Sequence, residues 1–170
     1  CCEGMNKRDT IMMKTISISL LLLITVQAQD GVTRFFVDRD ATGSANGTSW
    51  ANAWNNLYDI DFGDLSAGDT VYVSGGTDST TYYPNSASGI VLGNLDNASG
   101  QYTFASGNPV VICPSWETNH NGDVYLSALN AHGKILAVGN ISNIKITGFT
   151  LLDQRTQNLN GGGMVQLGNA

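Results

Sequence analysis

Cysteine is scarce in this sequence, which holds Cys1, Cys2 and Cys113 alone. The first two precede an expected leader that export would remove, so Cys113 would be the one cysteine of the mature chain. A single cysteine excludes an internal disulfide, and stability must then come from packing. Cys113 follows two aliphatic residues, so we expect a small buried apolar side chain. A catalytic thiol is disfavoured because no sequence neighbour would lower its pKa.

Positive charge is also scarce. From Gln29 onward, five basic residues stand against twelve acidic ones, a formal charge of 5 − 12 = −7. A nucleic-acid partner requires a basic face, so this balance argues against one. Charged residues make up 13% of the sequence, whereas Gly, Asn, Ser and Thr are abundant. Such a composition disfavours long helices and is typical of short strands joined by tight turns.

No apolar run is long enough to span a membrane. The longest, Ile16–Val26, falls short of the roughly 20 residues that a spanning helix needs. It follows the basic Lys14 and precedes Val26-Gln27-Ala28, which suits signal peptidase. We therefore expect a bacterial-type signal peptide at residues 13–28, cleaved after Ala28, with residues 1–12 as an upstream extension. A membrane anchor is the alternative. The mature chain is expected to be secreted or held at the cell surface.

Short apolar runs bounded by Gly, Asn, Ser or Pro fill the rest of the chain. Between Gly139 and Thr150, Ile144 and Ile146 alternate with Lys145 and Thr147, which predicts a strand with one buried face. Similar runs occur at Val71–Val73, Val110–Ile112, Val124–Leu126, Ile135–Val138 and Val165–Leu167. We expect aliphatic ladders inside the fold from Ile112, Ile135, Leu136, Ile144 and Ile146.

The spacing of these runs predicts a solenoid of stacked strands. Ile135 lies 23 positions after Ile112, and Val165 lies 21 positions after Ile144, close to the length of one solenoid coil. Three or four coils would fit. The turn-rich segment 77–106 interrupts the pattern, and we interpret it as an excursion from the solenoid with a strand at Gly89–Leu92.

An amino-terminal cap is expected before the coils. It would consist of a strand at Thr33–Val37, a turn-rich loop, and a short helix that Ser49 caps and that runs to Tyr58. Trp50 and Trp54 would lie on one helical face. This spacing favours core packing, and the alternative is a platform for stacking sugars.

The loop that follows the first strand carries Asp38, Asp40 and Asn46 at spacings loosely similar to those of a calcium loop. No bidentate Glu follows at the expected place. The sequence therefore favours a plain loop of Asx turns over a calcium site, and no metal site is predicted in this segment.

Several motifs, taken together, resemble a known superfamily. The order F-F-V-D, S-W-A-N-A-W and A-G-D-T-V-Y-V-S-G-G-T is similar to the amino-terminal entry of right-handed parallel β-helix proteins of the pectate-lyase-like superfamily. G-N-P-V-V-I-C-P-S-W from Gly107 and I-S-N-I-K-I-T-G-F-T from Ile141 resemble its recurring coils. The resemblance covers Arg34 to Leu152. It implies an all-β fold, a right-handed parallel β-helix with a short capping helix, in which residues 29–68 form the cap and 69–170 the first coils.

The resemblance implies a carbohydrate-directed protein without fixing a reaction, since lyases, hydrolases and non-catalytic surface proteins share such entry coils. A lyase needs a base and Ca²⁺ held by carboxylates, and a hydrolase needs two nearby carboxyl groups. Lys145, Asp153 and Arg155 are the candidate substrate-binding residues, although a solvated face is the simpler interpretation of Lys145. Further outward candidates are Glu117, His120, Asp123 and His132. No catalytic pair or zinc spacing is recognisable.

The last residues, Gly161–Ala170, open another coil, so we expect a chain truncated at its carboxyl end. Any catalytic coils, and any Ca²⁺, would then belong to the part downstream. The first hypothesis is an exported polysaccharide lyase or glycoside hydrolase. The second is a non-catalytic, adhesin-like stalk. In both, the partner would be a polysaccharide or a cell-surface glycan.

Overall fold

The computed structural model describes residues 32–85, 89–93, 101–127, 135–152 and 165–167. These residues form an all-β structure in which every strand pairing is parallel. The strands are β1 (Arg34–Val37), β2 (Thr70–Val73), β3 (Ser79–Tyr82), β4 (Ile90–Gly93), β5 (Tyr102–Thr103), β6 (Val110–Pro114), β7 (Asp123–Ser127), β8 (Leu136–Gly139), β9 (Ile141–Ser142), β10 (Ile144–Ile146), β11 (Thr150–Leu152) and β12 (Val165–Leu167). Among the described residues, the one helical element is a 3₁₀ turn, η1 (Leu57–Asp59).

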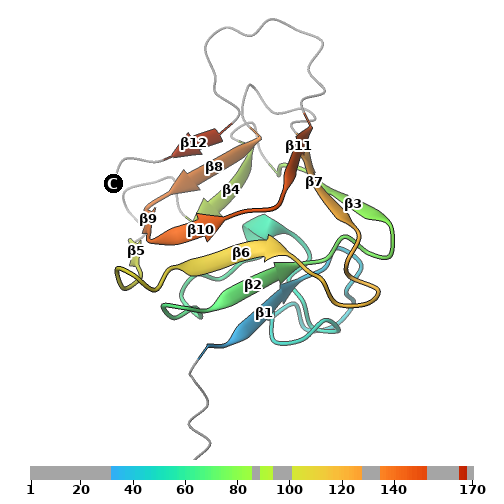
Figure 1. Cartoon of the computed structure of the whole chain (residues 1–170), viewed down its shortest axis with the longest axis horizontal. Helices are drawn as coiled ribbons and strands as arrows, with labels where there is room; N and C mark the ends of the chain where they lie inside the picture. Colours follow the sequence, from blue (N-terminus) through green and yellow to red (C-terminus); the bar gives the residue numbers. More distant parts are fainter. Residues whose placement is uncertain (1–31, 86–88, 94–100, 128–134, 153–164, 168–170) are drawn as a thin grey trace, which may run out of the picture. The chain divides into compact units, whose positions relative to one another are not determined.

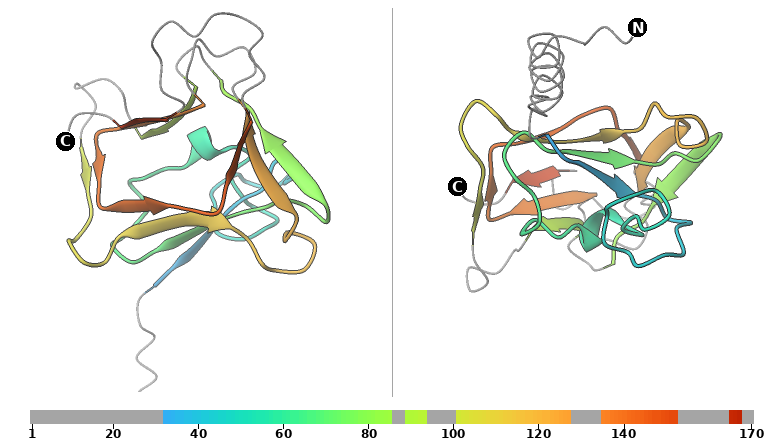
Figure 2. Two further views of the ribbon diagram at one scale, coloured as in Figure 1. Left: turned by 45° about the horizontal axis from the view of Figure 1, so that its top comes forward. Right: turned by 90° about the horizontal axis from the view of Figure 1, so that it is seen from below.

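The strands form four sheets, ordered β1-β2-β6-β10, β11-β7-β3, β12-β8-β4 and β5-β9. From β2 onward, the chain visits these sheets in a fixed rotation and returns to the first sheet at β6 and again at β10. Figure 1 shows β1, β2, β6 and β10 stacked in this order, and Figure 2 shows the chain bending from one sheet into the next. This arrangement is that of a parallel β-solenoid, as the sequence predicts.

The coils are longer than the predicted 21–23 residues. Thr70 of β2 pairs with Val111, 41 positions later, and Val110 of β6 pairs with Ile144, 34 positions later. The prediction was wrong because the apolar runs it compared belong to two sheets of one coil: Ile112 lies on β6 and Leu136 on β8. Each coil therefore contributes several buried runs, not one.

The segment 77–106 is part of the solenoid and not an excursion from it. It supplies β3, β4 and β5, which pair with β7, β8 and β9 of the next coil. Its many turn residues misled the interpretation, because a coil of short strands needs a turn at every corner. The strand predicted at Gly89–Leu92 is present as β4.

Inward side chains stack in columns across the sheets. In the first sheet, Phe35, Val71, Ile112 and Ile146 occupy one register position, and Val71 and Ile112 are fully buried. Of the residues predicted to line the interior, Ile112, Ile135 and Leu136 are buried, while Ile144 and Ile146 are half-buried. Lys145, between the last two, is exposed. The period-two pattern thus predicted the buried face correctly.

The predicted capping helix over Ser49–Tyr58 is absent, and a loop takes its place. Trp54 pairs with β1: its amide donates to Phe36 O at 3.0 Å, and its carbonyl accepts from Asp38 N at 2.8 Å. An edge strand offers a row of unpaired backbone groups, and pairing with them outweighs the helical pattern here. The cap is therefore a backbone-paired loop.

Gly47 makes that cap possible. Its carbonyl accepts from Phe36 N at 2.9 Å, its φ is +74°, and an added Cβ would lie 2.8 Å from the Trp54 ring. Trp54 is 3% exposed and stacks on Phe35 at a centroid distance of 5.5 Å. The loop thus delivers an indole over the first rung of the core, which confirms core packing for this tryptophan.

Two turns of neighbouring coils lie backbone against backbone. A Cβ on Gly122 would clash with Gly75 O, and Gly122 N donates to Gly76 O at 2.9 Å, so this contact fixes the turn that follows β2.

The entry into the first two strands is fixed at the other end of β2. Asp69, just before β2, is 1% exposed and accepts from Thr33 N and Ser66 N at 2.8 and 2.7 Å. These two hydrogen bonds fix where the chain enters β1 and β2.

Parts of the sequence-based interpretation lie outside the described residues. They include the upstream extension, the signal peptide at residues 13–28, and the side chains of Asp153 and Arg155. In the part of the chain that the structure describes, no helix is long and apolar enough to cross a membrane.

The buried and outward faces of the first sheet can be distinguished by two valine truncations. Val71→Ala removes two methyl groups from a fully buried site, and we expect it to lower the free energy of unfolding by about 2–3 kcal/mol. Val111→Ala, at a half-buried outward site one register position away, should cost less than about 1 kcal/mol. Urea denaturation measures both, and equal losses would contradict the assigned phase of the strands.

Candidate functional site

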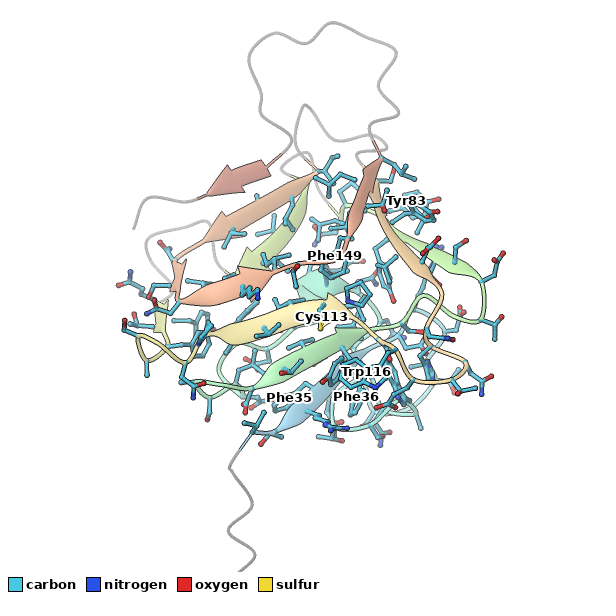
Figure 3. All side chains as sticks on the ribbon, in the orientation of Figure 1. Phe35, Phe36, Tyr83, Cys113, Trp116 and Phe149 are labelled. Carbon is cyan, nitrogen blue, oxygen red and sulfur yellow. The ribbon has the colours of Figure 1, made fainter. Side chains whose placement is uncertain are left out.

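The outward face of the first sheet carries aromatic side chains. Phe36 of β1 and Tyr72 of β2 are register neighbours with ring centroids 6.3 Å apart. Trp50, from the capping loop, lies 4.6 Å from the Phe36 ring, and Trp116, just after β6, meets Tyr72 edge to face at 4.7 Å. We call Phe36, Trp50, Tyr72 and Trp116 the aromatic face. Figure 3 shows Phe36 and Trp116 together beside β1 and β2.

Within the aromatic face, the exposed ring is Trp116. It is 65% exposed, whereas Tyr72 beneath it is 7% exposed. Burial of Tyr72 raises the pKa of its phenol, so the hydroxyl stays neutral over the physiological range. Trp116 therefore presents a large apolar surface to solvent on a fixed aromatic base.

One face of the half-buried Trp50 ring is covered by His120, which stacks on it at 3.8 Å with the ring planes 6° apart. The Phe36 ring lies 4.6 Å from it at an angle of 55°. Trp54, the other tryptophan considered as a sugar platform, is buried in the core. Their role is packing, which the sequence favoured, although not on a helix.

An acidic and a basic side chain border the aromatic face. Glu117 accepts a hydrogen bond from Trp50 Nε1 at 2.7 Å through Oε2, and its Oε1 lies 3.8 Å from Arg34 Nη1. The Arg34 guanidinium lies 6.0 Å from the Tyr72 ring centroid, and its side chain is 60% exposed. Arg34 thus keeps hydrogen-bond donors toward solvent beside Tyr72 and Glu117.

Lys145 is the predicted binding residue that the structure describes. It is exposed on β10 and pairs with Val111, which pairs with Thr70 and, through it, with Arg34. Lys145 and Arg34 therefore occupy the same register position on the two edge strands of one sheet, β10 and β1. None of the four strands between and including them carries an acidic residue.

His120 joins the ends of three neighbouring strands of the first sheet through one ring nitrogen. Its Nδ1 lies 3.0 Å from Asp38 Oδ2 and 3.0 Å from Ser74 Oγ. Asp38 follows β1, Ser74 follows β2, and His120 lies in the turn after β6. We call Asp38, Ser74 and His120 the clasp. A turn histidine was predicted, and this long-range contact was not.

The clasp has the residue types of a hydrolytic triad but not its geometry. In a triad the imidazole uses Nδ1 for the carboxylate and Nε2 for the serine, so that a proton can pass through the ring. Here both partners meet Nδ1. Ser74 is also 1% exposed, and its Oγ accepts from Gly76 N at 3.1 Å. The arrangement holds loops together and does not activate a nucleophile.

The loop considered for calcium is built from Asx turns. Asp38 Oδ1 accepts from Asp40 N at 3.0 Å while its Oδ2 faces His120, and Asn46 Oδ1 accepts from Thr48. This is the plain turn loop that the sequence favoured. Among the described residues, no three His, Cys, Asp or Glu side chains gather as a metal site.

Cys113 lies on the outward side of β6, in register with Tyr72, and is half-buried, whereas the sequence predicted a small buried side chain. Burial raises the pKa of its thiol, and the positive charge of Lys145 opposes that increase. A raised pKa leaves little thiolate at neutral pH, so the residue is poorly suited to nucleophilic chemistry.

The aromatic face was not predicted from the sequence, although the sequence indicates the direction of two of its side chains. In F-F-V and V-Y-V the alternation puts Phe36 and Tyr72 outward once the flanking residues are inward. Trp116 and Trp50 lie in loops, where periodicity does not indicate the direction of a side chain, and Trp50 contacts Glu117 across 67 positions.

A search of protein-family models and of curated proteins finds no match to this chain.

The clasp can be separated into its polar and stacking parts. His120→Phe would keep a ring over Trp50 and lose the contacts to Asp38 and Ser74, and we expect a loss of about 1–2 kcal/mol in unfolding free energy. His120→Ala would also lose the stack, for a total of about 2–3 kcal/mol. Chemical denaturation measures both. Thr118→Ala, in the same exposed turn, is the control, and an equal effect there would refute the clasp.

The thiol of Cys113 should react slowly. In a full-length chain with Cys1→Ser and Cys2→Ser, the alkylation rate with iodoacetamide should reach half its maximum at a higher pH than for free cysteine, because burial disfavours the thiolate. Adding Lys145→Met should move the midpoint higher still. A midpoint at or below that of free cysteine would contradict the burial, and an unmoved midpoint would contradict the lysine contribution.

Proposed function

We propose that this protein is an exported, carbohydrate-directed protein built on a right-handed parallel β-helix of the pectate-lyase-like kind, and that its aromatic face binds a glycan. The observation that carries the proposal is Trp116, which stands 65% exposed on a buried tyrosine at the border of a rigid sheet. Tryptophan, tyrosine and arginine are enriched among the residues that carry binding energy at interfaces, and Trp116 lies beside Tyr72 in this way.

The chemistry around Trp116 suits a sugar. The C–H faces of a pyranose ring are apolar and pack on an indole, while its hydroxyl groups seek donors and acceptors at the rim. Arg34 supplies donors, and the Glu117 carboxylate, already held by Trp50 and Arg34, supplies an acceptor. Both are fixed by the contacts that build the aromatic face.

The charges on the sheet favour an acidic glycan. Arg34 and Lys145 share a register position, and the strands of this sheet carry no acidic residue in a chain of formal charge −6. Glu117, in the turn after β6, lies 3.8 Å from Arg34 and offsets part of that charge. Such a surface attracts carboxylate or sulfate groups, with a strength that falls as salt rises. Asp153 and Arg155 stay proposed contributors from the sequence alone.

For the aromatic face we favour binding over cleavage. The carboxylates near it have structural partners: Glu117 holds Trp50 and Arg34, and Asp38 holds His120. A non-catalytic glycan-binding stalk is thus the form of the proposal that the contacts support best. A lyase or hydrolase remains the second candidate, supported by the sequence resemblance.

The test is binding of full-length protein to soluble polygalacturonate and to a neutral glucan, followed by calorimetry. Trp116→Ala should weaken binding about tenfold, because it removes an aromatic contact of about 1.4 kcal/mol. Arg34→Ala and Lys145→Ala should weaken binding of the acidic polymer more than that of the neutral one. Raising the salt concentration should reproduce this selective loss.

Tyr83→Ala is the matched control, since Tyr83 is an exposed aromatic residue elsewhere, 5.4 Å from Arg39. Equal losses for Tyr83→Ala and Trp116→Ala, or no binding to any glycan tested, would overturn the aromatic face as the site. The same samples, assayed for unsaturated uronate with calcium and with chelator, test for lyase activity, and calcium-dependent product would favour the lyase over the stalk.

A further inference from the structure

A second concave site lies on another part of the solenoid. It is a cleft of about 330 Å³ between the loop that precedes β2 and the segment around β5. The loop contributes Phe62, Gly63, Leu65, Ser66 and Ala67, and the β5 segment contributes Gln101, Tyr102, Thr103, Phe104 and Ala105. None of these residues belongs to the aromatic face.

Both walls of the cleft are fixed by hydrogen bonds. On the loop side, Ser66 N donates to the buried Asp69 at 2.7 Å, and Ala67 O accepts from Asn108 Nδ2 at 3.1 Å. On the β5 side, Tyr102 N donates to Asn140 O at 2.8 Å, and Phe104 O accepts from Asn143 Nδ2 at 2.7 Å. A ligand would meet a cleft that is already formed, which lowers the entropic cost of binding.

Aromatic and apolar residues form part of the lining of the cleft. Phe62, Leu65 and Phe104 are each at most 7% exposed, so they add only small apolar surfaces. Tyr102 is half-buried, and its ring centroid lies 5.8 Å from that of Phe62 at an interplanar angle of 41°. The Phe62 and Tyr102 rings are therefore tilted toward each other, and the face of each aromatic ring is electron-rich.

The charge beside the cleft is negative. The lining residues include no charged side chain, and the loop adds the exposed Asp61 and Asp64 next to them. Asp61 Oδ1 accepts from Gly63 N at 2.9 Å. A Cβ built on Gly63 would lie 3.1 Å from this oxygen and 4.0 Å from Tyr102 Cε1, so a glycine keeps open the space between carboxylate and ring.

From this combination we propose that the cleft binds a small organic cation, an ammonium group with an apolar body, held over Tyr102 and beside Asp61. Cations are attracted to the face of an aromatic ring, including rings at solvent-exposed sites. The neighbouring carboxylates add attraction from solvent, and no lining side chain repels the charge. An anion would be repelled by Asp61 and Asp64.

The probe is choline, compared with 3,3-dimethylbutan-1-ol, which has the same shape and no charge. By calorimetry on the full chain, choline should bind about two- to fivefold more tightly than the neutral alcohol, the range expected for a cation–π contact at an exposed site. Tyr102→Leu should remove most of this preference. Asp61→Asn should weaken choline binding and leave the alcohol unaffected.

Asp78→Asn is the matched control, because Asp78 is an exposed carboxylate in the turn before β3 and does not line the cleft. It should leave choline binding unchanged, and so should Trp116→Ala, which separates this site from the glycan surface. The proposal is overturned if choline does not bind, if the neutral alcohol binds equally well, or if Asp78→Asn and Asp61→Asn have the same effect.

Discussion

The stacking of like register positions is the constraint on which the rest of this structure depends. Phe35, Val71, Ile112 and Ile146 form one column because their strands pair in parallel without a slip. A slip of one residue would turn every buried side chain outward. The same constraint sets the outer surface, since Phe36 and Tyr72 can be neighbours only while Phe35 and Val71 are neighbours inside.

The number of residues in a coil varies, whereas the register between paired strands does not. Pairing partners on the first sheet are 41 positions apart in one coil and 34 in the next, and the difference is absorbed in the loops. This freedom explains why the sequence predicted strands well and coils poorly. Ile144, Lys145 and Ile146 show their phase directly in the sequence, whereas the number of strands per coil depends on which turns close a corner.

The cap and the site were hard to predict for a related reason. The Ser49–Tyr58 segment has a helical pattern, but the open edge of β1 takes Trp54 as a backbone partner, and a tertiary contact outweighs a local preference. The aromatic face joins the capping loop, two strands and the turn after β6. Within the aromatic face, Phe36 and Tyr72 lie on strands with an alternating pattern, so the sequence could predict the direction of these two side chains alone.

The clasp has a mechanical meaning. When the ends of a solenoid are pulled apart, its parallel strands separate one pair at a time, starting at the end that is pulled. Because His120 contacts both Asp38 and Ser74, the first three rungs are tied at one side. Separating β1 from the sheet therefore breaks the contact between Asp38 and His120 as well as the β1–β2 ladder, so the load on β1 also reaches the turn after β6.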